Sequence, residues 1–170
     1  MTMPRRDFLA LAAAAAGSAA LAPQRSLARD AKDLRIAVIG VNGRGQSHLD
    51  GLTSNVTAIC DVDANVLAER AGKFTEKSGR KVQTFRDYRD VVASPAVDAV
   101  TIATPNHTHS LIAIAAIQAG KHVYVEKPVS HNVWEGRQLV AAAEKSGLVV
   151  QVGTQSRSSR CLQEAVKYVR

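Results

Sequence analysis

The chain has 170 residues, of which 46% are apolar and 22% charged, with 22 Lys and Arg against 15 Asp and Glu. This composition excludes a disordered or low-complexity chain, and the length suits one domain with a sizeable core but not a large two-domain enzyme. The net charge of +7 suits an anionic ligand, whereas the scattered basic residues and only 4% aromatic residues argue against nucleic-acid binding. The two cysteines, Cys60 and Cys161, have neither zinc-site nor redox spacing, so no metal site is expected.

Residues 1–28 have the pattern of a signal peptide. A basic pair, Arg5 and Arg6, precedes an apolar run over residues 8–22, and a small-x-small sequence ends at Ala28. The run is shorter than the ~20 residues that span a bilayer, so no stable membrane anchor is expected. The pair begins Arg-Arg-Asp-Phe-Leu, which resembles the twin-arginine export signal. We therefore expect export by the twin-arginine machinery, after folding in the cytoplasm, to a periplasmic or other extracytoplasmic location.

After the signal peptide, short β-branched runs alternate with longer amphipathic segments, the pattern of a parallel sheet covered by helices. The predicted strands are residues 34–39, 56–60, 82–85, 97–102, 122–126 and 148–152. The predicted helices are residues 45–52, 64–78, 88–93, 109–119, 133–145 and 159–170. Right-handed crossovers would place the strands in the order 3-2-1-4-5-6, a Rossmann-like doubly wound α/β fold. The apolar segment 111–117 is expected to be buried. Trp134, within the helix 133–145, is expected to take part in helix packing, with a platform for substrate as the alternative.

A glycine-rich turn follows the first strand and opens the first helix. In the fingerprint Gly-x-Gly-x-x-Gly, the backbone amides of such a turn bind the diphosphate of a dinucleotide. Gly40 and Gly45 fit the outer positions, Asn42 occupies the middle one, and Gly43 is expected to supply the backbone freedom that Asn42 lacks. Arg44 would help to neutralise the diphosphate. The alternative is an ordinary turn between a strand and a helix.

An acidic residue at the end of the second strand favours the dinucleotide interpretation. Asp61 stands where a carboxylate accepts hydrogen bonds from the adenosine ribose. A carboxylate there repels a 2′-phosphate, so NAD is preferred over NADP as the cofactor. Asp63 is the competing candidate, but its position suits the cap of the next helix.

Two motifs follow the fourth and fifth strands, at the edge of the sheet where ligands bind. They are Thr-Pro-Asn-His-Thr-His at 104–109 and Gly-Lys-His-Val-Tyr-Val-Glu-Lys-Pro at 120–128. Together with the glycine-rich turn they strongly resemble the Gfo/Idh/MocA oxidoreductase family over residues 34–155, the NAD(P)-binding domain. Glu-Lys-Pro in this context is highly specific.

The resemblance implies roles for individual residues. The residues expected to line the nicotinamide side of the cofactor are Thr104, Pro105, Asn106 and His109. Glu126 and Lys127 are expected beside the nicotinamide, with Lys127 touching both the cofactor and a substrate hydroxyl. A partly desolvated lysine can stabilise an alkoxide or move a proton, so Lys127 is the predicted catalytic residue. The resemblance also implies a cis peptide bond before Pro128. Gln155 is a weaker candidate for contact with ribose or substrate, and His48 is taken as a helix residue.

Family members carry a second α/β domain after this one, and residues 156–170 are interpreted as the start of the next segment, a helix. We therefore expect a C-terminally truncated fragment that is inactive alone. The expected function of the parent protein is hydride transfer between NAD(P) and a sugar or polyol hydroxyl, in a protein that can form homo-oligomers. The alternatives are an NAD-dependent glycoside hydrolase of the same fold, or a non-catalytic nucleotide-binding fragment.

Overall fold

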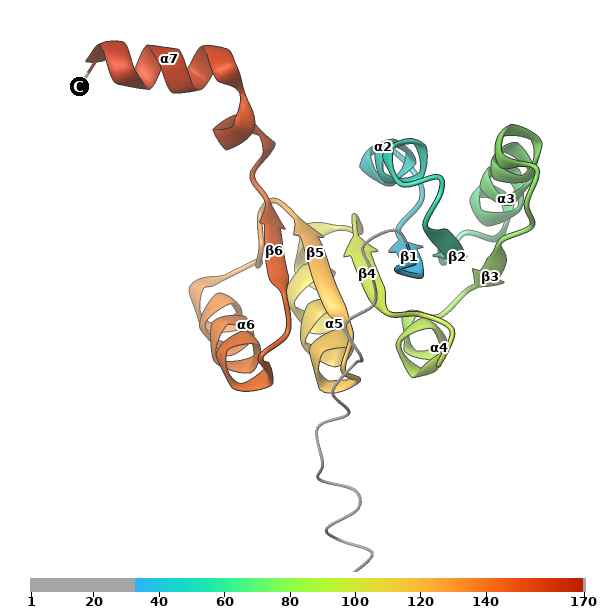
Figure 1. The fold of residues 1–170 in the computed structure, drawn as a ribbon. Coiled ribbons are helices and arrows are strands. Elements are labelled where there is room, and N and C mark those ends of the chain that lie inside the picture. Colours follow the sequence, from blue (N-terminus) through green and yellow to red (C-terminus); the bar gives the residue numbers. More distant parts are fainter. Residues whose placement is uncertain (1–32, 170) are drawn as a thin grey trace, which may run out of the picture.

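The computed structural model describes residues 33–169, which form one six-stranded parallel sheet with helices on both faces (Figure 1). The strands are β1 (Ile36–Ile39), β2 (Val56–Cys60), β3 (Gln83–Phe85), β4 (Ala99–Ile102), β5 (His122–Glu126) and β6 (Val150–Gly153). Their order is β3-β2-β1-β4-β5-β6, and every neighbouring pair is parallel. The predicted fold class and strand order are confirmed. The predicted signal peptide lies outside the described residues.

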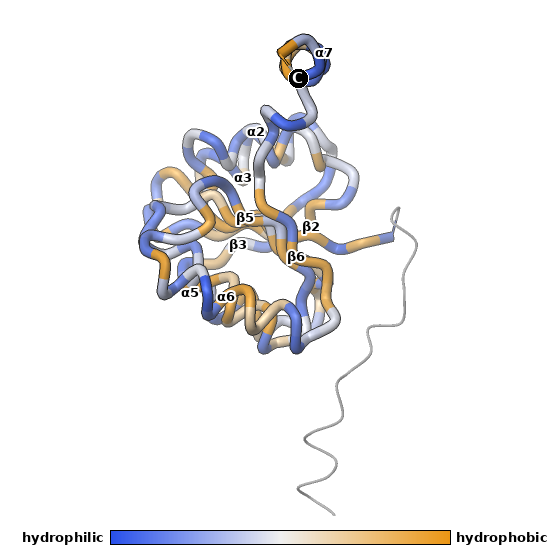
Figure 2. The backbone as a smooth tube through the Cα atoms, turned by 90° about the vertical axis from the view of Figure 1, so that its left-hand side faces the viewer, coloured by the Kyte–Doolittle hydropathy of each residue, from blue (hydrophilic) through white to orange (hydrophobic). Residues whose placement is uncertain are grey.

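The helices are α2 (Arg44–Gly51), α3 (Ala64–Ser78), α4 (Tyr88–Ala93), α5 (Asn106–Gln118), α6 (Val133–Ser146) and α7 (Arg160–Val169), with a 3-10 turn η1 (Gln155–Ser158) before α7. Helices α2 to α6 connect consecutive strands, and α7 follows β6. In Figure 2, α2 and α3 lie on one side of the sheet, and α5 and α6 lie on the other. Because all strands are parallel, their carboxyl ends meet at one edge, which is where α2 and α5 begin.

Two apolar clusters fill the space between the sheet and its helices. Successive side chains of a strand point to opposite faces, so neighbouring residues of β1 enter different clusters. Ala37 and Ile39 pack in the cluster that contains α5, whereas Val38 packs with residues of α2 and α3. Burial on both faces explains why the central strands β1 and β4 have consecutive buried residues without alternation, and it gives the loops at the carboxyl edge a rigid support.

Local sequence signals account for several helix ends. The Asp63 carboxylate accepts hydrogen bonds from the amides of Asn65 and Val66 and caps α3, as predicted. Gly79 and Gly147 follow α3 and α6 in the left-handed conformation, with φ of 69° and 67°, where glycine has no steric penalty.

Three local predictions are wrong. Helix α5 begins at Asn106 rather than at residue 109, because Pro105 (φ −58°, ψ 145°) forms its N-cap directly after an extended segment. Leu111 is 56% exposed although the segment is apolar, since only one side of α5 packs against the sheet. Trp134 is 70% exposed in the first turn of α6 and does not pack as expected.

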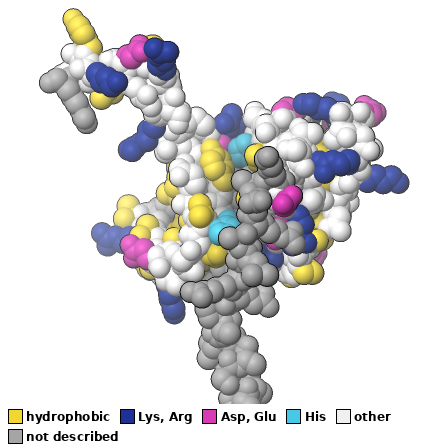
Figure 3. Space-filling model, in the orientation of Figure 1, with side chains coloured by type: hydrophobic (Ala, Val, Ile, Leu, Met, Phe, Trp, Pro, Cys, Tyr) yellow, Lys and Arg dark blue, Asp and Glu magenta, His cyan; other side chains and the backbone are white. Residues whose placement is uncertain are grey.

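The last described helix, α7, stands apart from the sheet in Figure 1 and contains no buried residue. Two of its apolar side chains, Leu162 and Val166, are about half exposed, and Val169 is 83% exposed. None of the helices within residues 33–169 combines the length and the apolar character needed to cross a membrane. Lys and Arg side chains are spread over the face shown in Figure 3 and are not gathered in one patch.

Candidate functional site

The turn after β1 is closed so tightly that two of its positions admit only glycine. Gly40 has φ of 82°, and a Cβ there would lie 2.8 Å from the carbonyl group of Ala103. A Cβ on Gly45 would lie 1.7 Å from the carbonyl oxygen of Gly40. The outer glycines of the predicted fingerprint therefore let α2 and the loop after β4 approach the turn.

In the middle of this turn, Gly43 supplies the backbone freedom that the second glycine of the fingerprint would give. Asn42 keeps a negative φ, whereas Gly43 has φ of 55° with open space around it, as the sequence predicted. The Asn42 Oδ1 atom accepts a hydrogen bond from the Gly43 amide at 3.0 Å. No side chain caps the start of α2, and the amides of Gly45 and Gln46 donate to the carbonyl oxygens of Asn42 (3.2 Å) and Gly43 (3.1 Å) within the turn. A diphosphate at this helix start stays a prediction.

Asp61 lies at the end of β2 beside this turn. Its Oδ2 accepts a hydrogen bond from the amide of Val41 at 3.0 Å, and its Oδ1 accepts one from the amide of Asp63 at 3.1 Å. Each carboxylate oxygen accepts more than one hydrogen bond, so the group keeps acceptor capacity for ribose hydroxyls. The ribose contact itself stays a prediction.

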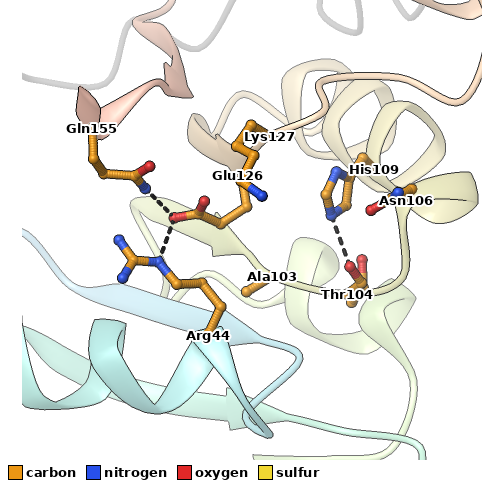
Figure 4. A pocket seen from close by; sticks show the side chains of 8 residues that line it. All are labelled: Arg44, Ala103, Thr104, Asn106, His109, Glu126, Lys127 and Gln155. Atoms are coloured by element: carbon orange, nitrogen blue, oxygen red, sulfur yellow. Dashed lines mark hydrogen bonds and ion pairs between the residues drawn. The ribbon is translucent and has the colours of Figure 1, made fainter. Parts of the chain in front are cut away.

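Two cavities adjoin along the carboxyl edge of the sheet. The aspartate cavity, about 550 Å³, is lined by Gly40, Asn42, Asp61, Arg86, Arg89, Thr104, Pro105, His107 and their neighbours. The lysine cavity, about 410 Å³, is lined by Arg44, Ala103, Thr104, Asn106, His109, Glu126, Lys127 and Gln155 (Figure 4). Ala103 and Thr104 belong to both. Of the predicted site residues, only Gly43 and Gly45 line neither cavity, and both act within the turn.

The aspartate cavity also contains two arginines that the sequence analysis missed. Arg86 and Arg89 follow β3, and Arg86 Nη2 donates to the carbonyl oxygen of Val62 at 3.0 Å. A carboxylate at this place favours NAD, whereas nearby arginines accommodate the 2′-phosphate of NADP. The position of Asp61 alone therefore does not decide between the two cofactors.

Glu126 is the centre of a buried cluster that joins three segments. Its Oε1 atom accepts hydrogen bonds from Gln155 Nε2 (2.6 Å), His48 Nε2 (2.9 Å) and Arg44 Nε (3.1 Å). Burial alone would raise the pKa of Glu126, but the hydrogen bonds from these three donors outweigh it and hold the pKa at about 2. The Glu126 side chain is therefore ionised at neutral pH, and its Oε1 atom is occupied by hydrogen bonds from three side chains of the protein.

The role of His48 was missed because its partner is distant in sequence. One signal was present: His48 stands four residues after Arg44, so both lie on the same face of α2. Gln155, a weak candidate for ribose or substrate contact, donates to Glu126 and to the hydroxyl of Tyr124 (3.2 Å) instead.

His109 lies in the wall of the lysine cavity and is 1% exposed. Its Nδ1 is 2.6 Å from the carbonyl oxygen of Pro128, and its Nε2 is 2.8 Å from that of Thr104. The ring thus ties the loop after β4 to the loop after β5. A contact between His109 and a cofactor stays a prediction.

Lys127 is an exposed side chain at the lysine cavity, one residue beyond β5. The bond between Lys127 and Pro128 is cis, as the family resemblance implied. Within the described part of the chain, the Lys127 ammonium group makes no hydrogen bond or ion pair, so it is free to meet a ligand.

The other titratable groups offer little alternative chemistry. No three His, Cys, Asp or Glu side chains among residues 33–169 are grouped so that they could hold a metal ion. Burial, with a smaller effect of the Asp61 carboxylate, raises the pKa of the Cys60 thiol to about 12, which makes it unreactive. Cys161 is exposed.

Comparison with known proteins identifies this arrangement. The NAD-binding Rossmann-fold model of the GFO_IDH_MocA oxidoreductase family matches residues 34–154. The chain belongs to the Gfo/Idh/MocA oxidoreductase family. It is 31% identical over 137 residues to Myo-inositol 2-dehydrogenase of Thermotoga maritima, covering 79% of this chain and 41% of that protein. It is 36% identical over 121 residues to 4-carboxy-2-hydroxymuconate-6-semialdehyde dehydrogenase of Sphingobium sp., covering 71% and 38%.

Solved structures give the same fold. Myo-inositol 2-dehydrogenase from Lactobacillus plantarum matches with a TM-score of 0.70 and 27% identity, over 81% of this chain and 41% of that one. Scyllo-inositol dehydrogenase from Lactobacillus casei, with bound NAD(H) and scyllo-inositol, matches with a TM-score of 0.71 and 24% identity, over the same shares. The chain thus spans about two fifths of the length of these relatives.

Proposed function

We propose that this chain is the cofactor-binding part of an oxidoreductase that transfers hydride between NAD and a hydroxyl-bearing carbon of a sugar or polyol. The observation that carries the proposal is the placement of Lys127 at a cavity that adjoins the glycine-rich turn and Asp61 along one sheet edge. The inositol dehydrogenases among the relatives support a polyol as the class of substrate.

In this proposal, each group of residues at the carboxyl edge of the sheet binds a different part of the cofactor. The amides at the start of α2, with the Arg44 guanidinium, bind the diphosphate, and Asp61 holds the adenosine ribose. The loop of Thr104, Pro105 and Asn106 borders the nicotinamide, together with His109. The nicotinamide, when bound, supplies the hydride chemistry.

Lys127 acts on the proton of the substrate hydroxyl. Oxidation of that carbon requires the hydroxyl to lose its proton as the hydride leaves, and a lysine ammonium or amine at the cavity can stabilise the alkoxide or move the proton. Glu126 does not compete for this task, because its Oε1 accepts three hydrogen bonds from Arg44, His48 and Gln155. The chain spans about two fifths of the length of its relatives, so on its own it should bind the cofactor without turnover.

Export is a separate part of the proposal and rests on the sequence of residues 1–28. A protein folded before export carries its cofactor with it, and the cofactor would then be regenerated within each catalytic cycle. Replacing Arg5 and Arg6 by Lys in a reporter fusion of residues 1–32 should abolish export through the twin-arginine route. Export that persists would contradict this part alone.

Titration of the folded chain with NAD and with NADP tests the central claim. We expect heat of binding for NAD and a weakened affinity in Lys127→Met, with Lys73→Met, on the exposed face of α3, as the matched control. A folded sample that binds neither cofactor would refute the proposal. With full-length protein, hydrolysis of a chromogenic glycoside without net NADH would favour the NAD-dependent glycoside hydrolase instead.

A further inference from the structure

The position of Lys127 is set by its neighbours in the chain. Its own side chain makes no polar contact within residues 33–169, so the backbone on either side must hold it at the cavity. The residues before and after it, Glu126 and Pro128, are each in contact with a buried histidine. These two histidines are 8% and 1% exposed.

The first contact comes from His48 on α2. Its Nε2 donates to Glu126 Oε1 at 2.9 Å, because an ionised carboxylate can only accept. The rings of His48 and Tyr124 pack in a T-shaped arrangement, with 5.5 Å between the ring centroids and an interplanar angle of 84°. On the other side, a Cβ on Gly153 would lie 3.0 Å from the carboxylate of Glu126, so the cluster has no spare room.

The second contact comes from His109 on α5. Its Nδ1 faces the carbonyl oxygen of Pro128 and its Nε2 faces that of Thr104. A neutral ring can donate to one of these oxygens, and a doubly protonated ring to both. Helices α2 and α5 lie on opposite sides of the sheet (Figure 2). The contacts of His48 with Glu126 and of His109 with Pro128 therefore come from helices on opposite faces.

We propose that His48 and His109 are positioning residues that hold Lys127 at the cavity, His48 through the carboxylate of Glu126 and His109 through the carbonyl oxygen of Pro128. The inference rests on the proposed function, in which Lys127 meets the nicotinamide end of the cofactor. His48 shares its acceptor with Arg44, so the same contact fixes the distance between the glycine-rich turn and Lys127. Such spacing matters because a displacement of about 1 Å at a reacting group can cost about a hundredfold in rate.

Asn and Gln substitutions separate this role from simple packing. The amide nitrogen of Gln reaches as far as Nε2 of histidine, and that of Asn reaches as far as Nδ1. At position 48 the contact uses Nε2, so His48→Gln keeps it and His48→Asn loses it. At position 109 the contact with Pro128 uses Nδ1, so His109→Asn keeps it and His109→Gln loses it. If the histidines only filled space, the same one of the two substitutions, Asn or Gln, would disturb the structure more at both positions.

Amide hydrogen exchange of Glu126, Lys127 and Val129 in the whole chain is the first measurement, and it needs no ligand. We expect exchange about tenfold faster in His48→Asn and His109→Gln, from the loss of one hydrogen bond each. Exchange should stay close to wild type in His48→Gln, His109→Asn and the exposed control His131→Leu. The proposal would be overturned if the same substitution, Asn or Gln, gave the faster exchange at both positions. Unchanged exchange in all four variants would also overturn it. The two variants that keep the contact are expected to fold, and fast exchange in them would overturn it as well.

The second measurement is the ratio of the dissociation constants for ADP-ribose, which lacks nicotinamide, and NAD. We expect this ratio to fall about fivefold in His48→Asn and to recover in His48→Gln, from the loss of about one hydrogen bond. In a Lys127→Ala background the further effect of His48→Asn should vanish, because the histidine acts through the lysine. If His48→Asn and Lys127→Ala instead changed this ratio independently, so that their effects multiplied in the double variant, the proposal would be overturned. Should the wild type bind neither compound, the proposed function fails, while hydrogen exchange still decides whether the histidines hold Lys127.

Discussion

Replacing Glu126 by Gln tests whether the buried cluster depends on a charged carboxylate. The substitution keeps the size of the side chain but removes the charge that faces Arg44 and His48. The pKa of Glu126 is lowered from its ordinary value of 4.5 to about 2. Since one pKa unit is worth about 1.36 kcal/mol, ionised Glu126 stabilises the fold at neutral pH by about 3 kcal/mol as an upper estimate.

The sign of the pH dependence follows from the direction of this change. A carboxyl whose pKa is lower in the folded state stabilises the protein above pH 4.5 and loses that effect as the pH falls towards 2. The difference in unfolding free energy between wild type and Glu126→Gln should therefore shrink by about 2 kcal/mol between pH 7 and pH 3. Any packing cost of the substitution is independent of pH and does not affect this slope.

Urea unfolding of both proteins at several pH values measures this difference directly. Glu144→Gln is the matched control, because Glu144 is exposed on α6 and its substitution should change the unfolding free energy by less than about 0.5 kcal/mol. A difference that stays constant from pH 7 to pH 3 would show that the charge of Glu126 does not stabilise the cluster. Equal stability of wild type and variant at pH 7 would refute the reasoning altogether.

Three further substitutions test the turn, a cap and the choice of cofactor. Gly45→Ala should destabilise the fold by about 3 kcal/mol, because its Cβ would lie 1.7 Å from the Gly40 carbonyl oxygen. Gly51→Ala, in the same helix but in open space, should stabilise by up to about 1 kcal/mol, and similar melting temperatures for the two would be contrary evidence. Asp63→Ala should cost about 1 kcal/mol in urea unfolding through loss of the α3 cap, and no cost would argue against that role. Asp61→Ser should raise the affinity for NADP relative to NAD about tenfold in calorimetric titration, and an unchanged preference would remove Asp61 as the selecting residue.

The sequence alone determined the fold class, the strand order and the elements of the turn. These depend on local features: apolar runs of strand length, helical periodicity, and glycines at positions that need a positive φ or a close approach. Gly43 and the Asp63 cap were predicted because their partners lie within three residues. The motifs around Thr104 and Lys127 were placed at one edge because parallel strands end on the same side.

Only the tertiary structure decided which side chains meet at that edge. Glu126 pairs with His48 and Arg44, which precede it by 78 and 82 residues, and these contacts form only when β4 lies between β1 and β5. The exposure of Leu111 and Trp134 was also beyond the sequence, since an apolar segment does not reveal which of its sides has a partner. Hydrogen bonds across strands depend on where the strands end in space, and neither composition nor periodicity carries that information.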